Sequence, residues 1–136
     1  MTTIEKLQAA LPPYPTQLGM VFTEAGRDRL VARMTVRPDM CNGSPFIHGG
    51  ALMAFADTLG AVSTIINIAP DKWTTTLESK TNFISPGPEG AVLIGETSAL
   101  HRGGRTQVWE TRITTADGRL VAKVTQTQMV LDKPKA

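Results

Sequence analysis

The sequence predicts an α+β fold in which a curved antiparallel β-sheet wraps around one long central helix. The first observation is an apolar segment, residues 51–69, that contains no Lys, Arg or Glu and a single Asp. A surface helix would carry charges on its outer face. The second observation is that almost everything after this segment has the composition of strands and turns. A helix without charges has to be enclosed, and the sheet is the material available to enclose it.

Two elements are expected before the central helix. Residues 1–13 predict a short N-terminal helix, because apolar residues recur at helical spacing until Pro12 and Pro13 stop it. Residues 27–36 alternate in the way that is typical of a half-buried strand. In the central segment, apolar residues recur at spacings of three and four before Pro70, which predicts a helix of about four to five turns.

Four strands are expected after the helix, in residues 72–86, 90–100, 105–115 and 119–131. Turn sequences separate them, and one of these contains Asp-Gly, a pair typical of tight hairpins. Successive strands with short turns predict an antiparallel meander, which the strand before the helix joins through a longer connection. A sheet of this kind curled around a single helix is the hotdog fold.

Length and composition limit the classes of protein. The 136 residues are expected to form a single domain, 1–136. Charged residues make up 19% of the chain and the formal net charge is +2, so no global basic field would recruit nucleic acid. The single cysteine, Cys41, excludes an internal disulfide, and no signal sequence is recognised at the N-terminus. Segment 46–70 is too polar for a membrane span. We expect a soluble, cytoplasmic protein.

Motifs around the start of the central helix resemble those of a known family. They consist of Asn42, Gly43, His48, Gly49, Gly50 and Asp57. At this spacing they resemble the PaaI-like hotdog acyl-CoA thioesterases, and the resemblance extends over roughly residues 17–131. It implies hydrolysis of a thioester between coenzyme A and an acyl or aryl-acyl group, in a site shared between two subunits of a homodimer or of a dimer of dimers. It implies no cofactor, since coenzyme A is part of the substrate.

The N-terminus of the central helix is the predicted oxyanion site. Unpaired backbone N–H groups and a partial positive charge gather there, and Gly49 and Gly50 let a substrate oxygen approach the chain. A thioester carbonyl attacked by water develops negative charge on its oxygen, which the Gly49 N–H would stabilise with help from its neighbours. The alternative is that the two glycines only allow a tight turn into the helix.

Asp57 is the predicted catalytic carboxylate. It lies inside an otherwise apolar helix, where an unpaired carboxylate is costly unless it is partnered or protonated. It would act as a general base that takes a proton from the attacking water, or as a nucleophile that forms a short-lived anhydride. We favour the base, although the sequence does not separate the two. The alternative is a carboxylate bonded to neighbouring hydroxyls for structural reasons.

Three further residues complete the predicted catalytic group. The resemblance implies that Asn42 donates its side-chain amide to the thioester, and the alternative is a turn with Gly43. His48 is expected to hold the loop through its ring, with direct acid or base action as the alternative. Thr76 matches the place where the family carries a hydroxyl that orients the water, although Thr is ordinary in a strand. Ala61 stands where Glu-containing relatives carry Ser or Thr, which groups the chain with the Asp-containing branch.

A basic turn is the candidate site for the phosphates of coenzyme A. It follows His101 and consists of Arg102, Gly103, Gly104 and Arg105. Guanidinium and backbone N–H groups suit phosphate contacts. The alternative is a solvated hairpin end. No metal site is expected, because two histidines and one cysteine scattered along the chain do not make a ligand set.

Helix geometry predicts a shared active site. On one helix Gly49 and Asp57 would lie roughly 12 Å apart along the axis, which a single carbonyl can hardly span. Two helices packed antiparallel across a two-fold axis would bring Gly49 of one chain beside Asp57 of the other. A non-catalytic acyl-CoA binding or sensing module is the alternative function. A hotdog dehydratase is a weaker one, since those enzymes have a different arrangement of Asp and His.

Overall fold

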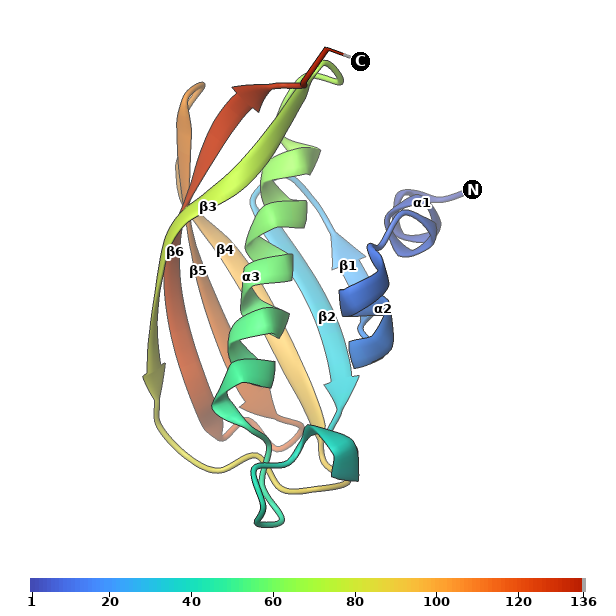
Figure 1. Ribbon diagram of the computed structural model, residues 1–136, viewed down its shortest axis with the longest axis vertical. Coiled ribbons are helices and arrows are strands. Elements are labelled where there is room, and N and C mark those ends of the chain that lie inside the picture. The colour runs from blue at the N-terminus through green and yellow to red at the C-terminus, as the bar shows by residue number, and fades with distance from the viewer. Residues whose placement is uncertain (136) are drawn as a thin grey trace.

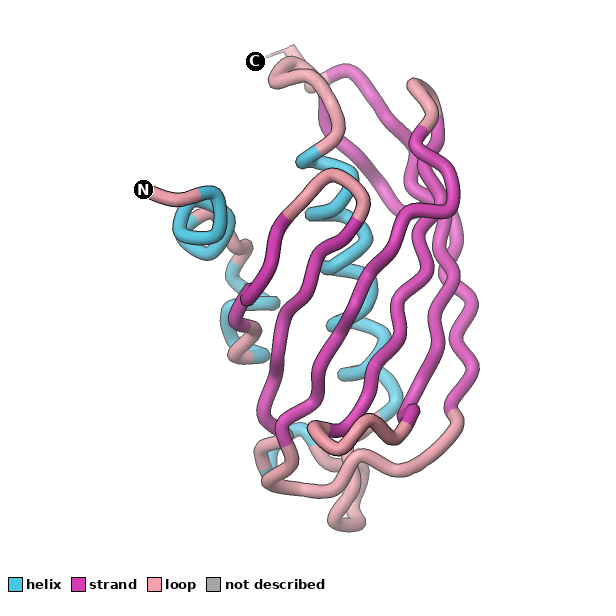
Figure 2. The backbone as a smooth tube through the Cα atoms, turned by 180° about the vertical axis from the view of Figure 1, so that it is seen from behind, coloured by secondary structure: helices cyan, strands magenta, loops and turns pink. Residues whose placement is uncertain are grey.

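The chain forms a curved sheet with one long helix lying along its inner face (Figures 1 and 2). A computed structural model describes residues 1–135. The predicted α+β hotdog architecture is confirmed. In chain order the elements are α1 (Thr3–Ala9), α2 (Pro13–Leu18), β1 (Val21–Ala25), β2 (Arg29–Thr35), the short 3-10 helix η1 (Pro38–Met40), α3 (Gly49–Ile66), β3 (Lys72–Phe83), β4 (Val92–Arg102), β5 (Thr106–Thr115) and β6 (Leu120–Asp132).

The six strands pair antiparallel in the order β1-β2-β4-β5-β6-β3. The predicted four-stranded meander is therefore wrong for its first strand, because β3 pairs with β6 and not with β4. The connection from β3 to β4, residues 84–91, contains Pro86 and Pro88 and crosses below the start of α3 (Figure 1). Strand composition indicates that a segment is extended, but it does not identify the neighbouring strand. Only β4, β5 and β6 form the meander.

The N-terminal segment contains two short helices where one was predicted. α1 ends before the two prolines, as expected, and Thr2 and Glu5 form a capping box at its start. Pro13, however, begins α2, because proline is tolerated in the first turn, where its missing N–H has no partner to lose. The side chain of Gln8 then ties α1 to the start of β1, donating to the Met20 carbonyl (2.9 Å) and accepting from the Phe22 N–H (2.9 Å).

One face of α3 packs tightly on the sheet. Leu52, Phe55 and Leu59, in the first half and the middle of the helix, are buried against the strands. Gly95 of β4 lies opposite them, and a Cβ at that position would come within 2.6 Å of Leu59 Cδ1 and 2.9 Å of Phe55 Cζ. The close approach of helix and strand therefore depends on the missing side chain.

The opposite face of α3 is covered only in part. α2 packs on one side of it, but Met53 is 39% exposed and Ile65 is 52% exposed. The sequence predicted that α3 is enclosed. Within a single chain, only the face that packs on the sheet is enclosed. By length and hydropathy alone α3 also qualifies as a membrane-crossing segment, a weak signal that the core helices of soluble proteins share. The edge strand β3 adds further exposed apolar side chains: Trp73, Leu77 and Phe83.

We predict that Gly95→Ala lowers the free energy of unfolding by about 1–3 kcal/mol, because the added methyl group overpacks the contact with Leu59 and Phe55. Urea denaturation monitored by circular dichroism measures this free energy of unfolding. Gly104→Ala is the matched control, since no atom lies within 4 Å of a Cβ built there. Equal stability of the two variants would contradict a close contact between α3 and β4.

Candidate active site

The loop that precedes α3 ends in a cap formed by His48. Its backbone is extended (φ −65°, ψ 137°), and its Nδ1 accepts a hydrogen bond of 2.8 Å from the Gly50 N–H. The His48 N–H donates to the Met40 carbonyl at 2.8 Å. The ring of His48 thus caps α3 through the Gly50 N–H, and its backbone N–H ties the loop to Met40. Among residues 1–135 no acceptor takes the Gly49 N–H, so this donor remains available.

Gly49 and Asn42 line the same cavity, of about 410 Å³. Asn42 is exposed, and its Oδ1 accepts hydrogen bonds from the backbone and the hydroxyl of Ser44. With the oxygen held in this way, the amide NH₂ of Asn42 is the part that can donate to a ligand. Phe83 forms the facing wall, only 3.0 Å from where a Cβ on Gly49 would lie. The cavity therefore presents two N–H donors beside apolar walls.

Asp57 lies about two turns further along α3 and is half-buried. The hydroxyl of Thr76, on β3, donates to its Oδ1 at 2.6 Å, and Gln126 Nε2, on β6, donates to the same oxygen at 3.3 Å. The structure therefore brings together Asp57 and Thr76, two of the predicted catalytic residues. Among the described residues no donor reaches the other carboxylate oxygen, Oδ2.

A second cavity, of about 300 Å³, lies beside Asp57. α1, α2 and α3 build it together, and apart from Asp57 and Thr58 its walls are Leu7, Ala10, Leu11, Pro12, Pro15, Ala61, Val62 and Ile65. It shares no lining residue with the cavity at Gly49. Within one chain, the predicted oxyanion donor and the predicted base thus face different cavities.

The basic turn lies at the C-terminal end of α3, away from Gly49. Arg102 pairs with Asp28 (Nε to Oδ1, 3.0 Å) and donates to the Asn67 side chain (3.1 Å) next to the helix end. Its guanidinium is therefore already engaged in holding the turn. Arg105 is exposed, and among residues 1–135 it forms no ion pair. Gly103 and Gly104 shape the turn, with the Gly103 N–H donating to the Thr106 carbonyl.

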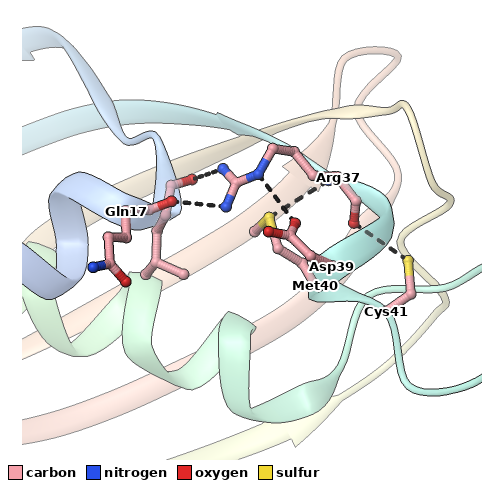
Figure 3. A network of polar contacts seen from close by, with 6 residues as sticks. Gln17, Arg37, Asp39, Met40 and Cys41 are labelled. Carbon is pink, nitrogen blue, oxygen red and sulfur yellow. Dashed lines mark hydrogen bonds and ion pairs between the residues drawn. The ribbon is translucent and has the colours of Figure 1, made fainter.

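Arg37 connects the loop before α3 to the N-terminal helices (Figure 3). Its guanidinium donates to the carbonyls of Gln17 (2.7 Å) and Leu18 (3.2 Å) at the end of α2, and it pairs with Asp39 at 3.1 Å. Cationic groups at a helix C-terminus satisfy carbonyls that have no partner within the helix. Arg37 thereby attaches the end of α2 to the segment that leads to α3.

Cys41 is not suited to thiol catalysis. Burial raises the pKa of its thiol, and the negative charges of Glu89 and Asp39 raise it further. A thiol with a raised pKa carries little of the reactive thiolate near neutral pH. Its Sγ donates instead to the Arg37 carbonyl (Figure 3).

Gln126 and Gln128 of β6 are part of the Asp57 environment and were not predicted. Both are fully buried on the face of β6 that points to α3, and Gln128 Nε2 donates to the Thr76 hydroxyl at 2.7 Å. The sequence did contain a signal for these two residues. Inward and outward positions alternate along β6, and the two glutamines continue the inward series that begins with Ala122 and Val124. A buried amide is costly unless it is hydrogen-bonded, as is a buried carboxylate. The same reasoning that singled out Asp57 would have found them.

Comparison with known proteins identifies relatives. A family model described as the thioesterase superfamily matches residues 45–122. A 1,4-dihydroxy-2-naphthoyl-CoA hydrolase of Escherichia coli (strain K12) is 33% identical over 116 residues, which cover 84% of this chain and 83% of that protein. The solved structure of the E. coli PaaI protein from the phenylacetic acid degradation operon has a TM-score of 0.84 at 23% identity and covers 94% of this chain and 91% of its own. A Streptococcus mutans UA159 protein solved with acetyl CoA has a TM-score of 0.77 at 24% identity, with 85% and 91% covered. The resemblance to PaaI-like hotdog thioesterases is confirmed.

We predict that His48→Ala lowers the free energy of unfolding by about 1 kcal/mol, because the Gly50 N–H loses its acceptor at the start of α3. His48→Asn should retain most of the stability, since Asn is a favourable N-cap. Chemical denaturation gives the free energy of unfolding of each variant, which is compared with that of the wild type. A destabilisation of the same size in both would show that the cap bond is not what His48 contributes.

Proposed function

The chain belongs to the thioesterase superfamily, and we propose that it hydrolyses acyl- or aryl-acyl-coenzyme A in an active site completed by a second copy of the chain. One relative is named for hydrolysis of an aryl-acyl-CoA, and a protein of the same fold was solved with acetyl CoA. The observation that carries the proposal is the pairing of an available Gly49 N–H in one cavity with a hydrogen-bonded Asp57 in another.

Antiparallel packing of two α3 helices would join these half-sites. Gly49 and Asp57 lie roughly 12 Å apart along one helix axis, too far for both to contact one thioester. Across a two-fold axis, Gly49 of one chain would lie beside Asp57 of the other, and two equivalent sites would result. A dimer, or a dimer of dimers, follows from this geometry as a proposal.

The surfaces that such a dimer needs are available on the monomer. The outer face of α3 exposes Met53 and Ile65, and the edge strand β3 exposes Trp73, Leu77 and Phe83. An edge strand presents unpaired backbone groups that another chain can pair with. Apolar side chains beside such an edge favour its burial rather than its contact with water.

In the proposed mechanism Asp57 acts as a general base. It takes a proton from a water molecule, whose oxygen attacks the thioester carbonyl carbon. The Gly49 N–H stabilises the negative charge that forms on the carbonyl oxygen, and the Asn42 amide donates to the same group. The carbon–sulfur bond then breaks, the departing thiolate of coenzyme A takes up the proton from Asp57, and the free acid leaves. Water is the only other reactant, so the reaction requires no cofactor.

We predict that Asp57→Ala and Gly49→Pro each lower kcat by about a hundredfold or more, since one removes the base and the other the oxyanion donor. When the two inactive variants are mixed and subunits exchange, each mixed dimer keeps one intact site. Activity should then return to about half the wild-type value per heterodimer. The activity of each variant and of the mixture is measured as steady-state hydrolysis of a panel of aryl, short-chain and long-chain acyl-CoAs.

As a control, subunit exchange is measured directly: one variant carries an affinity tag, and the untagged variant that it retains shows that mixed dimers have formed. No recovery after proven exchange would mean that each chain builds its own site. Near-wild-type activity of folded Asp57→Ala would overturn the role of Asp57.

We predict that Arg105→Ala raises KM for acyl-CoA by about tenfold and changes kcat by less than about twofold, because a phosphate contact is remote from the reacting carbon. Arg119→Ala, in another exposed hairpin, is the matched control and should leave KM unchanged. Arg102→Ala should lower stability as well, since Arg102 also holds Asp28 and Asn67. An unchanged KM for Arg105→Ala at low ionic strength would locate the phosphates elsewhere.

A further inference from the structure

Asp57 is held by a chain of side chains that begins on the sheet. Thr74 Oγ1 lies 2.9 Å from Gln128 Oε1, Gln128 Nε2 lies 2.7 Å from Thr76 Oγ1, and Thr76 Oγ1 lies 2.6 Å from Asp57 Oδ1. Gln128 is fully buried, as is Gln126, which reaches Asp57 separately. Two amides placed in a core are expensive unless their polar atoms are used.

The direction of each hydrogen bond in this chain is determined by Asp57. An ionised carboxylate can only accept, so the Thr76 hydroxyl must give its hydrogen to Oδ1. The Thr76 oxygen is then free to accept, which requires the NH₂ group of Gln128 and not its oxygen on that side. Gln128 Oε1 then faces the Thr74 hydroxyl, whose one hydrogen is shared between this oxygen and the Met129 carbonyl, each at 2.9 Å. Each member thereby fixes the orientation of the next.

The two carboxylate oxygens of Asp57 have different surroundings as a result. Oδ1 accepts from both Thr76 (2.6 Å) and Gln126 (3.3 Å). Among residues 1–135 no side chain or backbone group donates to Oδ2. The carboxylate is therefore anchored through one oxygen, while the other is left to take a proton from water.

Gly60 provides the space that Gln126 needs. A Cβ at Gly60, one turn after Asp57 on α3, would lie 2.2 Å from Gln126 Cδ, 2.3 Å from its Nε2 and 2.5 Å from its Oε1. Real Cβ atoms do not approach other atoms so closely, so any larger residue would push the amide away from Asp57. Gln126 Nε2 also donates to the Asp57 carbonyl at 3.4 Å, which centres the amide over this turn of the helix.

We propose that Gln126 and Gln128 are positioning residues of the active site, which fix Asp57 through Oδ1 so that Oδ2 is the oxygen that acts as the base, and that Gly60 is the residue that admits Gln126. This inference rests on the proposed role of Asp57 as the base. Neither glutamine touches the substrate, so their effect passes through Asp57 and Thr76.

The test measures kcat and KM for Gln126→Met and Gln128→Met, which keep the side-chain volume and remove the donors. Both should lower kcat by about ten- to hundredfold, since small misplacements of a catalytic group are costly, and KM should change by less than about twofold. Gln107→Met is the matched control, because Gln107 is equally buried, lies opposite Gln128 on β5 and donates only to the Gly103 carbonyl. A loss of kcat in all three variants alike would overturn the proposal in favour of a general effect on core packing.

A thermodynamic cycle separates this proposal from the role of Asp57. In an Asp57→Ala background, Gln128→Met should cause no further loss of the residual rate, because a residue that acts through Asp57 has nothing left to position. An equal loss in both backgrounds would overturn the positioning role while leaving Asp57 as the base. Full activity of Asp57→Ala alone would overturn both.

Two further variants keep the test decisive if a methionine variant does not fold. Gln128→Glu retains the acceptor for Thr74 but replaces the amide donor with a second oxygen, so the Thr76 hydroxyl gains a competing acceptor and kcat should fall. Gly60→Ala should reproduce the kcat loss of Gln126→Met with unchanged KM, and the double variant should lose no more than either single one. Wild-type kcat in folded Gly60→Ala and Gln128→Glu would overturn the proposal.

Discussion

A long helix that carries almost no charge is the constraint on which the rest of the structure depends. α3 contains no Lys, Arg or Glu, so it is stable only where other parts of the protein cover it. Strands β2 to β6 all pack on one of its faces, where Gly95 leaves room for Leu59 and Phe55 and Gly60 leaves room for the side chain of Gln126. The sheet curves because it has to reach around this single element. The opposite face, with Met53 and Ile65, stays exposed and favours a second copy of the chain as its cover.

The core beneath α3 has two parts with different chemistry. From Leu52 to Leu59 the helix packs through Leu52, Phe55 and Leu59, which contribute burial of apolar surface without directional contacts. Toward the C-terminal half the core becomes polar, with the Trp109 indole donating to Thr64 at 3.0 Å and with buried glutamines nearby. Hydrogen bonds between buried groups of this kind favour one arrangement, because breaking them in the core is costly, although Gln126 Oε1 has no partner among the described residues. The apolar part holds the helix against the sheet, and the polar part reaches the Asp57 carboxylate through Thr76 and Gln126.

The N-terminal segment contributes to the candidate site as well as to the fold. Gln8 attaches α1 to β1, and Arg37 attaches α2 to the loop that leads to His48 (Figure 3). Leu7 and Leu11 are held in place by these contacts and line the side of the Asp57 cavity opposite α3 residues such as Val62. An apolar wall at this place excludes water from all but the polar edge of the cavity, which strengthens the electrostatic contacts of a carboxylate there.

The sequence by itself determined the central helix, the strand composition around it and the choice of Asp57 as the unusual residue. These follow from local rules, since helical spacing and the cost of an isolated charge are properties of neighbouring residues. The tertiary structure added the cap that His48 forms at the start of α3. The tertiary structure alone decided that β3 pairs with β6, that Pro13 begins a helix, and that Gly49 and Asp57 face separate cavities. It also decided that Gln126 reaches Asp57 and that Gln128 reaches Thr76, because strand pairing joins residues distant in the chain and no local pattern specifies which strand becomes the neighbour.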